Sequence, residues 1–289
     1  IGLIPSYASI GIWAPILLLL CKMAQGFSVG GEYTGASIFV AEYSPDRKRG
    51  FMGSWLDFGS IAGFVLGAGV VVLISTVVGE DNFLDWGWRI PFLFSIVLVL
   101  GALWMRNRMD ESAEFEQQQQ AAQPEKKRLP VVEALIRHPG AFLKIIGLRL
   151  CELLTMYIVT AFALNYSTEK LHMSSQLFLN ISLMVGAISC VSIPFFAMIA
   201  DRFGRRRMCI MGGLIGAIAA FPFFLALQSG SVFWLVILSI LLANLAHDMV
   251  VSVHQPIFTE LFGAEYRYSG AGVGYQLASI IGGGFTPFI

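Results

Sequence analysis

The sequence predicts an all-α membrane protein, and three observations carry this prediction. Hydrophobic residues make up 56% of the 289 positions and charged residues only 13%, against roughly 25% charged residues in soluble domains. The apolar residues gather into stretches of about 20 residues, the length that a helix needs to cross a bilayer. These stretches are too long and too uniformly apolar for the alternating strands of a membrane barrel.

Eight apolar stretches follow one another along the chain, and we expect each to form one transmembrane helix. Buried helices of a large soluble enzyme are the alternative, but such an enzyme would carry far more charge. The expected helices lie near residues 12–40, 51–78, 90–105, 141–166, 177–199, 208–228, 232–261 and 269–289.

Basic residues predict the orientation of these helices. Fourteen Lys and Arg residues fall in alternate loops, and only Arg89 and Lys170 fall in the loops between them. Because cytoplasmic loops are enriched in Lys and Arg, we expect the basic loops to face the cytoplasm. The formal net charge of zero hides this asymmetry and gives no reason to expect nucleic acid as a partner. The basic loops are 44–50, 106–141, 200–208 and 262–268.

A repeated pattern links two of these loops. The segment 42–50 reads EYSPDRKRG, and 218 residues later the segment 260–270 reads ELFGAEYRYSG. In both, a Glu ends an apolar segment, an Arg follows seven positions later and another apolar segment begins soon after. Such a spacing is typical of a duplicated helical bundle.

The same 218-residue spacing predicts further helices outside this sequence. The basic block 201–207 reads DRFGRRR, and its counterpart would fall before residue 1. We therefore expect twelve helices in two groups of six, of which this chain holds the fourth to the eleventh and lacks the upstream ones. The long polar stretch that begins at residue 109 marks the boundary. The expected domains are 1–108, the second half of the first bundle; 109–140, a cytoplasmic link; and 141–289, the second bundle without its last helix.

Charged residues within expected spans are costly unless they are paired or wetted. Arg149 and Glu152 lie three positions apart on one helix face and can neutralise each other. A guanidinium also binds a carboxylate through two parallel hydrogen bonds. We therefore expect Arg149 and Glu152 to take part in binding an anionic substrate, with a purely structural ion pair as the alternative.

Polar residues also form a stripe along the seventh expected helix. His247 and Asp248 are expected to take up protons, because imidazole titrates near neutral pH, and Asn244 and Gln255 to contact a substrate. A helix kink near Pro256 with both imidazoles hydrogen-bonded is the alternative. Asp57 and Glu32 are further expected proton-coupling residues, although both lie near the end of a span. The spacings that define the stripe are those of Asn244, His247, Asp248, Val251, His254 and Gln255.

The motifs resemble the major facilitator superfamily. The resemblance rests on DRFGRRR at 201–207, on EYSPDRKRG at 42–50 and on the six-plus-six layout. KMAQGFSVGGE from Lys22 and WGWRIPF from Trp86 resemble its metabolite:proton symporter branch. Within that branch, residues 1–92 resemble proline/glycine betaine symporters. Residues 93–289, with RLCELLTM from Arg149 and AHDMVV from Ala246, resemble shikimate permeases. A mosaic of the two groups, truncated at both ends, is one interpretation.

The resemblance implies a conformational latch on the basic loops. Opposite charges that meet only when this face is closed would favour one conformation over the other. A signal of membrane orientation, or a solvated cluster of charges, is the alternative. Within the latch, Glu42 is expected to pair with Arg47 or Arg49, and Glu260 with Arg267. The expected latch residues are Asp201, Arg202, Gly204, Arg205, Arg206, Glu42, Arg49, Glu260 and Arg267.

Glycines repeat at every fourth position in three segments, and such faces let helices pack closely. Gly59, Gly63 and Gly67 form one of these faces, and Gly212 and Gly216 belong to another. We expect close helix contacts at both, for packing or for gating.

The function implied by the resemblance is proton-coupled symport of a small organic solute across a bacterial inner membrane. A shikimate-like carboxylate is favoured as the solute, and a zwitterionic osmolyte such as proline or betaine is the alternative. A non-transporting membrane fragment is the alternative from another class. No enzyme nucleophile, cofactor loop or channel filter stands out. The four cysteines lack Cys-x-x-Cys spacing, so we expect no metal, no cofactor and no disulfide.

Overall fold

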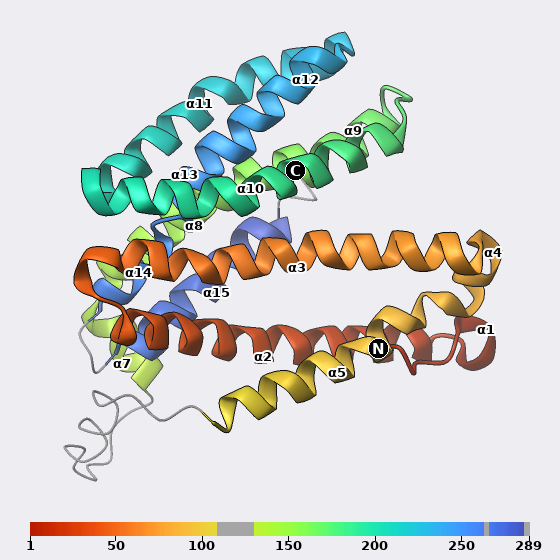
Figure 1. Cartoon of the computed structure of the whole chain (residues 1–289), viewed down its shortest axis with the longest axis horizontal. Helices are drawn as coiled ribbons and strands as arrows, with labels where there is room; N and C mark the ends of the chain where they lie inside the picture. Colours follow the sequence, from red (N-terminus) through yellow and green to blue (C-terminus); the bar gives the residue numbers. More distant parts are fainter. Residues whose placement is uncertain (109–129, 263–265, 286–289) are drawn as a thin grey trace. The chain divides into compact units, whose positions relative to one another are not determined.

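A computed structural model describes residues 1–108, 130–262 and 266–285 of the chain. Every regular element within these ranges is helical (Figure 1), as the composition predicts. Most of the expected link between the bundles, residues 109–129, lies outside the described residues, as do 263–265 and 286–289.

Seven helices in the described ranges are long and apolar enough to cross a membrane. The eighth expected span, 269–289, coincides with α15 (Arg267–Phe285), which is not among them. Six glycines and several polar residues interrupt the apolar run of α15, so the expected count of eight is not confirmed. The seven are Trp13–Tyr43, Arg49–Val78, Phe83–Arg106, Pro139–Glu169, Ser175–Phe203, Arg205–Ser229 and Val232–Glu260.

The chain divides into two compact units. The first comprises residues 1–32 and 63–123, and the second comprises 33–62 and 124–289. Helices α2 (Trp13–Tyr43) and α3 (Arg49–Val78) are each divided between the two units. The other helices of the first unit are α1 (Tyr7–Ile10), α4 (Glu80–Asn82), the π-helical segment η2 (Phe83–Gly87) and α5 (Arg89–Arg106).

Arg89 ties the start of the chain to α5 in the first unit. Its guanidinium donates hydrogen bonds to the carbonyl oxygens of Gly2 and Ile4, at 2.9 and 2.8 Å. The guanidinium carbon also lies 4.7 Å from the centre of the Trp88 ring. The guanidinium of Arg89 therefore has its partners within the first unit.

The second unit contains the rest of the helices and one bent span. The seventh span begins as α12 (Val232–Ser239), continues as a π-helical segment η4 (Ile240–His247) and α13 (Asp248–Val251), and turns at residues 252–253 before α14 (His254–Glu260). Pro256 lies in the first turn of α14, where its missing N–H costs little. The span expected near 232–261 is present as Val232–Glu260, and the kink weighed for this region lies within it.

The described part of the second unit contains eight further elements. They are the 3₁₀ turn η1 (Asp46–Lys48), α7 (Pro130–Arg137), α8 (Pro139–Tyr157), the π-helical segment η3 (Ile158–Phe162), α9 (Ala163–Glu169), α10 (Ser175–Phe203) and α11 (Arg205–Ser229), in addition to α15.

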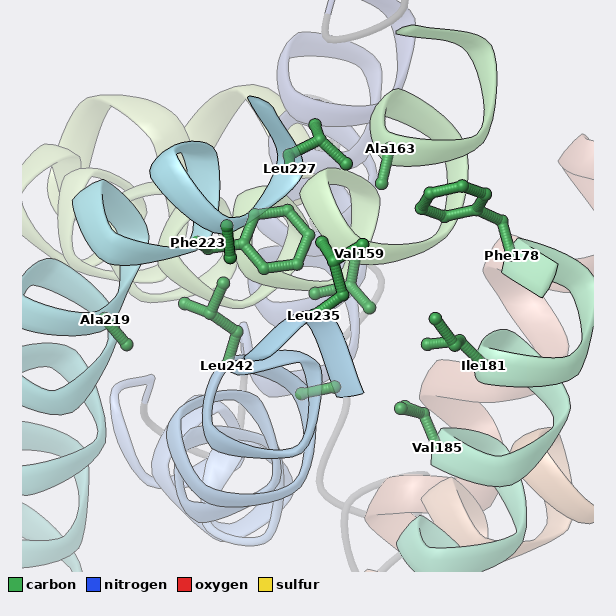
Figure 2. Packing of buried hydrophobic residues seen from close by; sticks show 12 residues of the cluster. Val159, Ala163, Phe178, Ile181, Val185, Ala219, Phe223, Leu227, Leu235 and Leu242 are labelled. Carbon is green, nitrogen blue, oxygen red and sulfur yellow. The ribbon is translucent and has the colours of Figure 1, made fainter. Parts of the chain in front are cut away.

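The largest apolar core of the second unit lies between η3, α10, α11 and α12 (Figure 2). Phe178 of α10 and Phe223 of α11 are each 1% exposed, and Leu235 of α12 is fully buried. Aromatic residues of this size contribute a large share of the burial that holds helices together. This core fixes α10 and α11 against the seventh span, which carries most of the polar stripe.

Glycines permit a close helix contact at only one of the two faces that we singled out. A Cβ on Gly212 would come within 2.8 Å of the carbonyl oxygen of Ala246, so α11 approaches η4 through a residue without a side chain. Gly216 continues the same face. A Cβ on Gly59, Gly63 or Gly67 would meet no described atom within 4 Å. The expected close contact along α3 therefore stays a prediction.

Candidate functional site

The second unit holds a group of ionisable side chains within its candidate membrane spans, which we call the polar cluster. Its members come from α3, α8, η4, α13 and α14. The side chain of Arg149 is 12% exposed, and the other members are 8% exposed or less. The polar cluster consists of Asp57, Arg149, Glu152, His247, Asp248 and His254.

Arg149 uses three parts of its guanidinium in different ways. Its Nη1 donates to Oε1 of Glu152, and its Nη2 donates to the hydroxyl of Tyr275 at 2.6 Å. The guanidinium carbon lies 4.0 Å from the centre of the Tyr275 ring, which is a cation–π contact. Its Nε is buried and has no hydrogen-bond partner among the described residues. Nε is therefore a guanidinium nitrogen of Arg149 that remains available inside the protein.

Two tyrosines connect Arg149 to a second carboxylate. The rings of Tyr275 and Tyr33 have their centres 4.8 Å apart, and the hydroxyl of Tyr33 donates to Oδ1 of Asp57 at 2.5 Å. Nε2 of Gln255 donates to the same Tyr33 hydroxyl. Oδ2 of Asp57 is buried without a partner among the described residues. Asp57 thus accepts one hydrogen bond, from Tyr33, and its other oxygen can accept a second hydrogen bond or a proton.

Glu152 lies between Arg149 and two histidines. Its Oε2 is 2.8 Å from Nδ1 of His254, and its Oε1 is 3.8 Å from Nε2 of His247. The ring of His254 stacks on Phe258, with centres 4.7 Å apart, and its Nε2 has no partner in the described ranges. The imidazole of His254 is therefore only partly satisfied, unlike the fully bonded imidazoles of the kinked-helix alternative.

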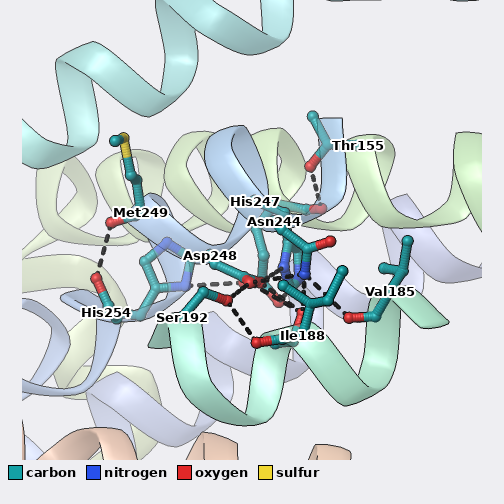
Figure 3. Close-up of polar contacts among 12 residues, drawn as sticks. Thr155, Val185, Ile188, Ser192, Asn244, His247, Asp248, Met249 and His254 are labelled. Atoms are coloured by element: carbon teal, nitrogen blue, oxygen red, sulfur yellow. Dashed lines mark hydrogen bonds and ion pairs between the residues drawn. The ribbon is translucent and has the colours of Figure 1, made fainter. Parts of the chain in front are cut away.

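Asp248 is fully buried and is surrounded by donors (Figure 3). Ser189 donates to both of its oxygens at 2.9 and 3.1 Å, and Ser192 donates to Oδ2. Asn244 donates to Oδ2 at 3.2 Å, and Nδ1 of His247 lies 2.8 Å from Oδ1. Hydrogen bonds of this number offset the cost of burying a charge. Asp248 thereby anchors His247 between two carboxylates.

The structure brings most of the predicted site residues together. Arg149 and Glu152 are paired, as their spacing predicts. His247, Asp248 and Asn244 share one network, and Gln255 reaches Asp57 through Tyr33. Glu32 is the exception, because it is exposed on the part of α2 that belongs to the first unit.

Sequence reasoning missed four residues that complete this network: Tyr33, Tyr275, Ser189 and Ser192. Ser189 and Ser192 lie three positions apart within an otherwise apolar span, so their shared helix face was a readable signal. The two tyrosines gave no such signal. They meet Arg149 and Asp57 from helices that are far away in the sequence, and only the packing of α2 and α15 brings them there.

A second polar contact joins α10 to the N-terminus of α3. The carboxylate of Asp201 accepts hydrogen bonds from the backbone N–H groups of Gly50 and Phe51, at 3.0 and 2.9 Å. Free N–H groups at a helix N-terminus attract an anion. Gly50 leaves room for this contact, because a Cβ there would collide with the carboxylate. We call this contact the Asp201 cap.

Arg205 extends the Asp201 cap to α14. Its Nη2 lies 3.8 Å from Oδ1 of Asp201, and its Nη1 donates to Oε1 of Glu260 at 2.5 Å. Gly204 joins α10 to α11 with a φ of 99°, a conformation that residues with a Cβ rarely adopt. This tight turn places Asp201 and Arg205 on adjoining helix ends.

The other expected latch residues are placed less specifically. Arg202 and Arg206 are exposed, and Glu42 and Arg49 are half-buried. Glu260 was expected to face Arg267, but in the described residues its partner is Arg205. The side chain of Arg267 lies outside the described part, so the expected pair with Glu260 stays a prediction.

Seven apolar spans in the described ranges, together with a buried ionisable cluster within the spans of the second unit, define a multi-pass membrane protein with a polar site among its helices. A comparison with protein-family models agrees with this class. The family model for the Major Facilitator Superfamily matches residues 1–287. The chain belongs to the Major Facilitator Superfamily.

Individual relatives extend this finding. The chain is 64% identical, over its whole length, to the shikimate transporter of Escherichia coli strain K12. It is 47% identical over 99% of its length to the proline/betaine transporter of Salmonella typhimurium. It is 45% identical over its whole length to the glycine betaine/proline/ectoine/pipecolic acid transporter of Dickeya dadantii. These relatives are transporters and not enzymes.

The chain spans 66%, 58% and 59% of the lengths of these three relatives. Both groups of relatives expected from the sequence therefore match. Each match runs along the whole chain, so the division into two origins at residue 92 stays a prediction.

Proposed function

We propose that the chain is part of a proton-coupled symporter that moves a small organic anion by alternating access, with a shikimate-like carboxylate as its substrate. The observation that carries this proposal is Arg149. It is a permanent cation within a membrane span, held between Glu152 and Tyr275 with its Nε unpartnered among the described residues. A cation in this position is costly, and charged residues within membrane spans are usually functional.

Arg149 is the proposed partner of the substrate carboxylate, and Glu152 belongs to the same subsite as the group that pairs with Arg149. A ring carboxylate with hydroxyl groups also needs neutral donors and acceptors. Asn244 and Gln255 supply such groups from η4 and α14, and the oxygen of the Asn244 amide has no partner in the described ranges. The chemistry of these side chains fits a hydroxylated acid.

The aromatic rings favour an anion over a quaternary ammonium ion. Aromatic faces are the usual binding surface for such cations. Here the face of Tyr275 is covered by the guanidinium of Arg149, and the centre of the Tyr33 ring lies 4.8 Å from that of Tyr275. Betaine, which carries this cation, is therefore the weaker candidate, although relatives named as betaine transporters match the chain.

Proton coupling is proposed to take place within the polar cluster, where Asp57, His247 and Asp248 lie. An imidazole between two carboxylates changes its charge state with modest changes in its surroundings. Asp57 contributes an unpartnered carboxylate oxygen. Glu32 remains a weaker candidate, because it is exposed and lies in the first unit.

We further propose the following arrangement in a bacterial inner membrane. The chain provides the fourth to eleventh of twelve helices, with 1–108 and 141–289 in successive bundles and 109–140 as their link. The basic loops face the cytoplasm, as their charge favours. The Asp201 cap and the pair of Arg205 with Glu260 act as the latch that stabilises one conformation.

Competition between substrates tests this proposal. Proteoliposomes that contain the full-length protein are loaded with unlabelled shikimate, and the exchange of external labelled shikimate is measured against added shikimate or betaine. We expect shikimate to compete at concentrations about tenfold or more below those of betaine, because the quaternary ammonium of betaine would add a cation near Arg149 and the face of Tyr275 is already covered. If betaine blocks the exchange better, substrate choice rests with other residues. If the full-length protein exchanges no shikimate at all, the proposed substrate is wrong. Uptake of shikimate by this chain alone would exclude the alternative of a non-transporting membrane fragment.

A further inference from the structure

Glu152 occupies the place on Arg149 that an incoming carboxylate would take. Its Oε1 accepts from Nη1 of Arg149, while its Oε2 lies 2.8 Å from Nδ1 of His254. The second terminal nitrogen of Arg149 is bound to Tyr275. A bidentate contact from a substrate can use Nε, which is unpartnered among the described residues, together with a terminal nitrogen, and there the incoming carboxylate competes with Glu152 or Tyr275.

The charges of the polar cluster determine whether a proton must accompany an anionic substrate. It contains one permanent cation, Arg149, and three carboxylates, on Asp57, Glu152 and Asp248. An anionic substrate adds one more negative charge to a buried site, where an unbalanced charge is costly. The balance can be restored only by a proton on one of the carboxylates or on His247 or His254.

We propose that the substrate carboxylate displaces Glu152 from Arg149 and that the displaced Glu152 is neutralised by a proton taken up by His254, one proton for each negative charge of the substrate. This inference rests on the proposed function. The proton enters from the water on the side where the site is open. The 2.8 Å contact between Nδ1 of His254 and Oε2 of Glu152 already contains the hydrogen of a neutral imidazole. The added proton therefore binds Nε2 of His254, which has no partner among the described residues, and the resulting imidazolium forms a neutral pair with Glu152. The proton leaves when Glu152 returns to Arg149.

His254 fits this role better than the other titratable groups near Glu152. Nδ1 of His247 lies 2.8 Å from Asp248, and its Nε2 is 3.8 Å from Glu152, against 2.8 Å for His254. Asp57 is bound to Tyr33 of α2. The charged groups that face His254 are Glu152 and Arg149 of α8 and His247 of η4. Of these, only Glu152 loses its partner when substrate binds.

Linkage gives this proposal two measurable consequences. If substrate binding favours the proton, the proton must favour substrate binding by the same factor. A monoanion should therefore take up about one proton when it binds, and its affinity should rise as the pH falls. A zwitterion adds no net charge to the polar cluster, so it should take up none.

The test measures protons taken up for each shikimate bound, in weakly buffered solution with a pH indicator and the purified full-length protein. We expect about one proton in the wild type and close to none in His254→Gln. His172→Gln is the matched control, because His172 is exposed in a loop and its variant should match the wild type. A His254→Gln protein that takes up as many protons as the wild type overturns the proposal.

A second variant, Glu152→Gln, is expected to bind shikimate more tightly than the wild type. Misfolding cannot produce such a gain in affinity. A neutral amide competes less well for Arg149, so we expect shikimate to bind about fivefold or more tightly, with affinity that no longer depends on pH. Binding that is weaker and still pH-dependent contradicts the inference. If the wild type itself binds no shikimate, the proposed function fails first, and this inference fails with it.

Discussion

Replacing Arg149 by Ala is expected to abolish uptake of an anionic substrate while the protein still reaches the membrane. Two effects add up. The substrate loses its bidentate partner, and Glu152 loses a charge that offsets its burial. Removing one partner of a buried ion pair costs about 3–5 kcal/mol, or roughly two to four orders of magnitude in an equilibrium constant. Initial rates of labelled shikimate uptake in proteoliposomes, normalised to protein in the membrane, measure this loss.

A double variant separates binding from folding. Arg149→Ala with Glu152→Gln removes the cation and also neutralises the carboxylate that it leaves behind. Thermal stability should recover toward that of the wild type in the double variant, and uptake should not. Normal uptake in Arg149→Ala, with only a lower melting temperature, would mean that Arg149 serves solely as the structural partner of Glu152.

Replacing Gly50 by Ala is expected to break the Asp201 cap. A Cβ at this position collides with the carboxylate that accepts the N–H groups of Gly50 and Phe51. Loss of two hydrogen bonds to a charged group, together with the attraction of a helix N-terminus, costs about 2–4 kcal/mol. Hydrogen–deuterium exchange of the peptide around residues 49–55 should become about tenfold faster or more, and uptake should fall because one conformation loses its latch.

Gly59→Ala is the control on the same helix. A Cβ on Gly59 would meet no described atom within 4 Å, so the same substitution should leave exchange and uptake near wild-type values. Asp201→Asn should resemble Gly50→Ala, because the amide keeps an acceptor but loses the charge. Wild-type exchange and uptake in Gly50→Ala would show that the contact between α10 and α3 is not a latch.

Local spacing predicted those parts of the site that lie on one helix. Arg149 and Glu152 could be paired from the sequence because residues three apart share a helix face. No such spacing indicated the contact of Glu260 with Arg205, which lies 55 positions away and comes from another helix end. Contacts of this kind depend on packing, and no local pattern contains them.

Helical periodicity also misjudged the seventh span. The stripe from Asn244 to Gln255 was read on a regular α-helix, but η4 is π-helical and the chain turns at residues 252–253. These departures rotate the side chains relative to a regular helix. His254 consequently faces Glu152, while its neighbour Gln255 faces Tyr33. The sequence identified the polar residues of this span, and the backbone decided which of them meet.

Accumulation of shikimate under an imposed pH gradient tests the central claim most directly. Proteoliposomes with the full-length protein are diluted into a more acidic buffer, and internal labelled shikimate is followed with and without a protonophore. The account predicts accumulation above equilibrium that the protonophore abolishes, and no comparable accumulation of labelled betaine. Accumulation of betaine without that of shikimate, or shikimate uptake that ignores the gradient, would contradict it.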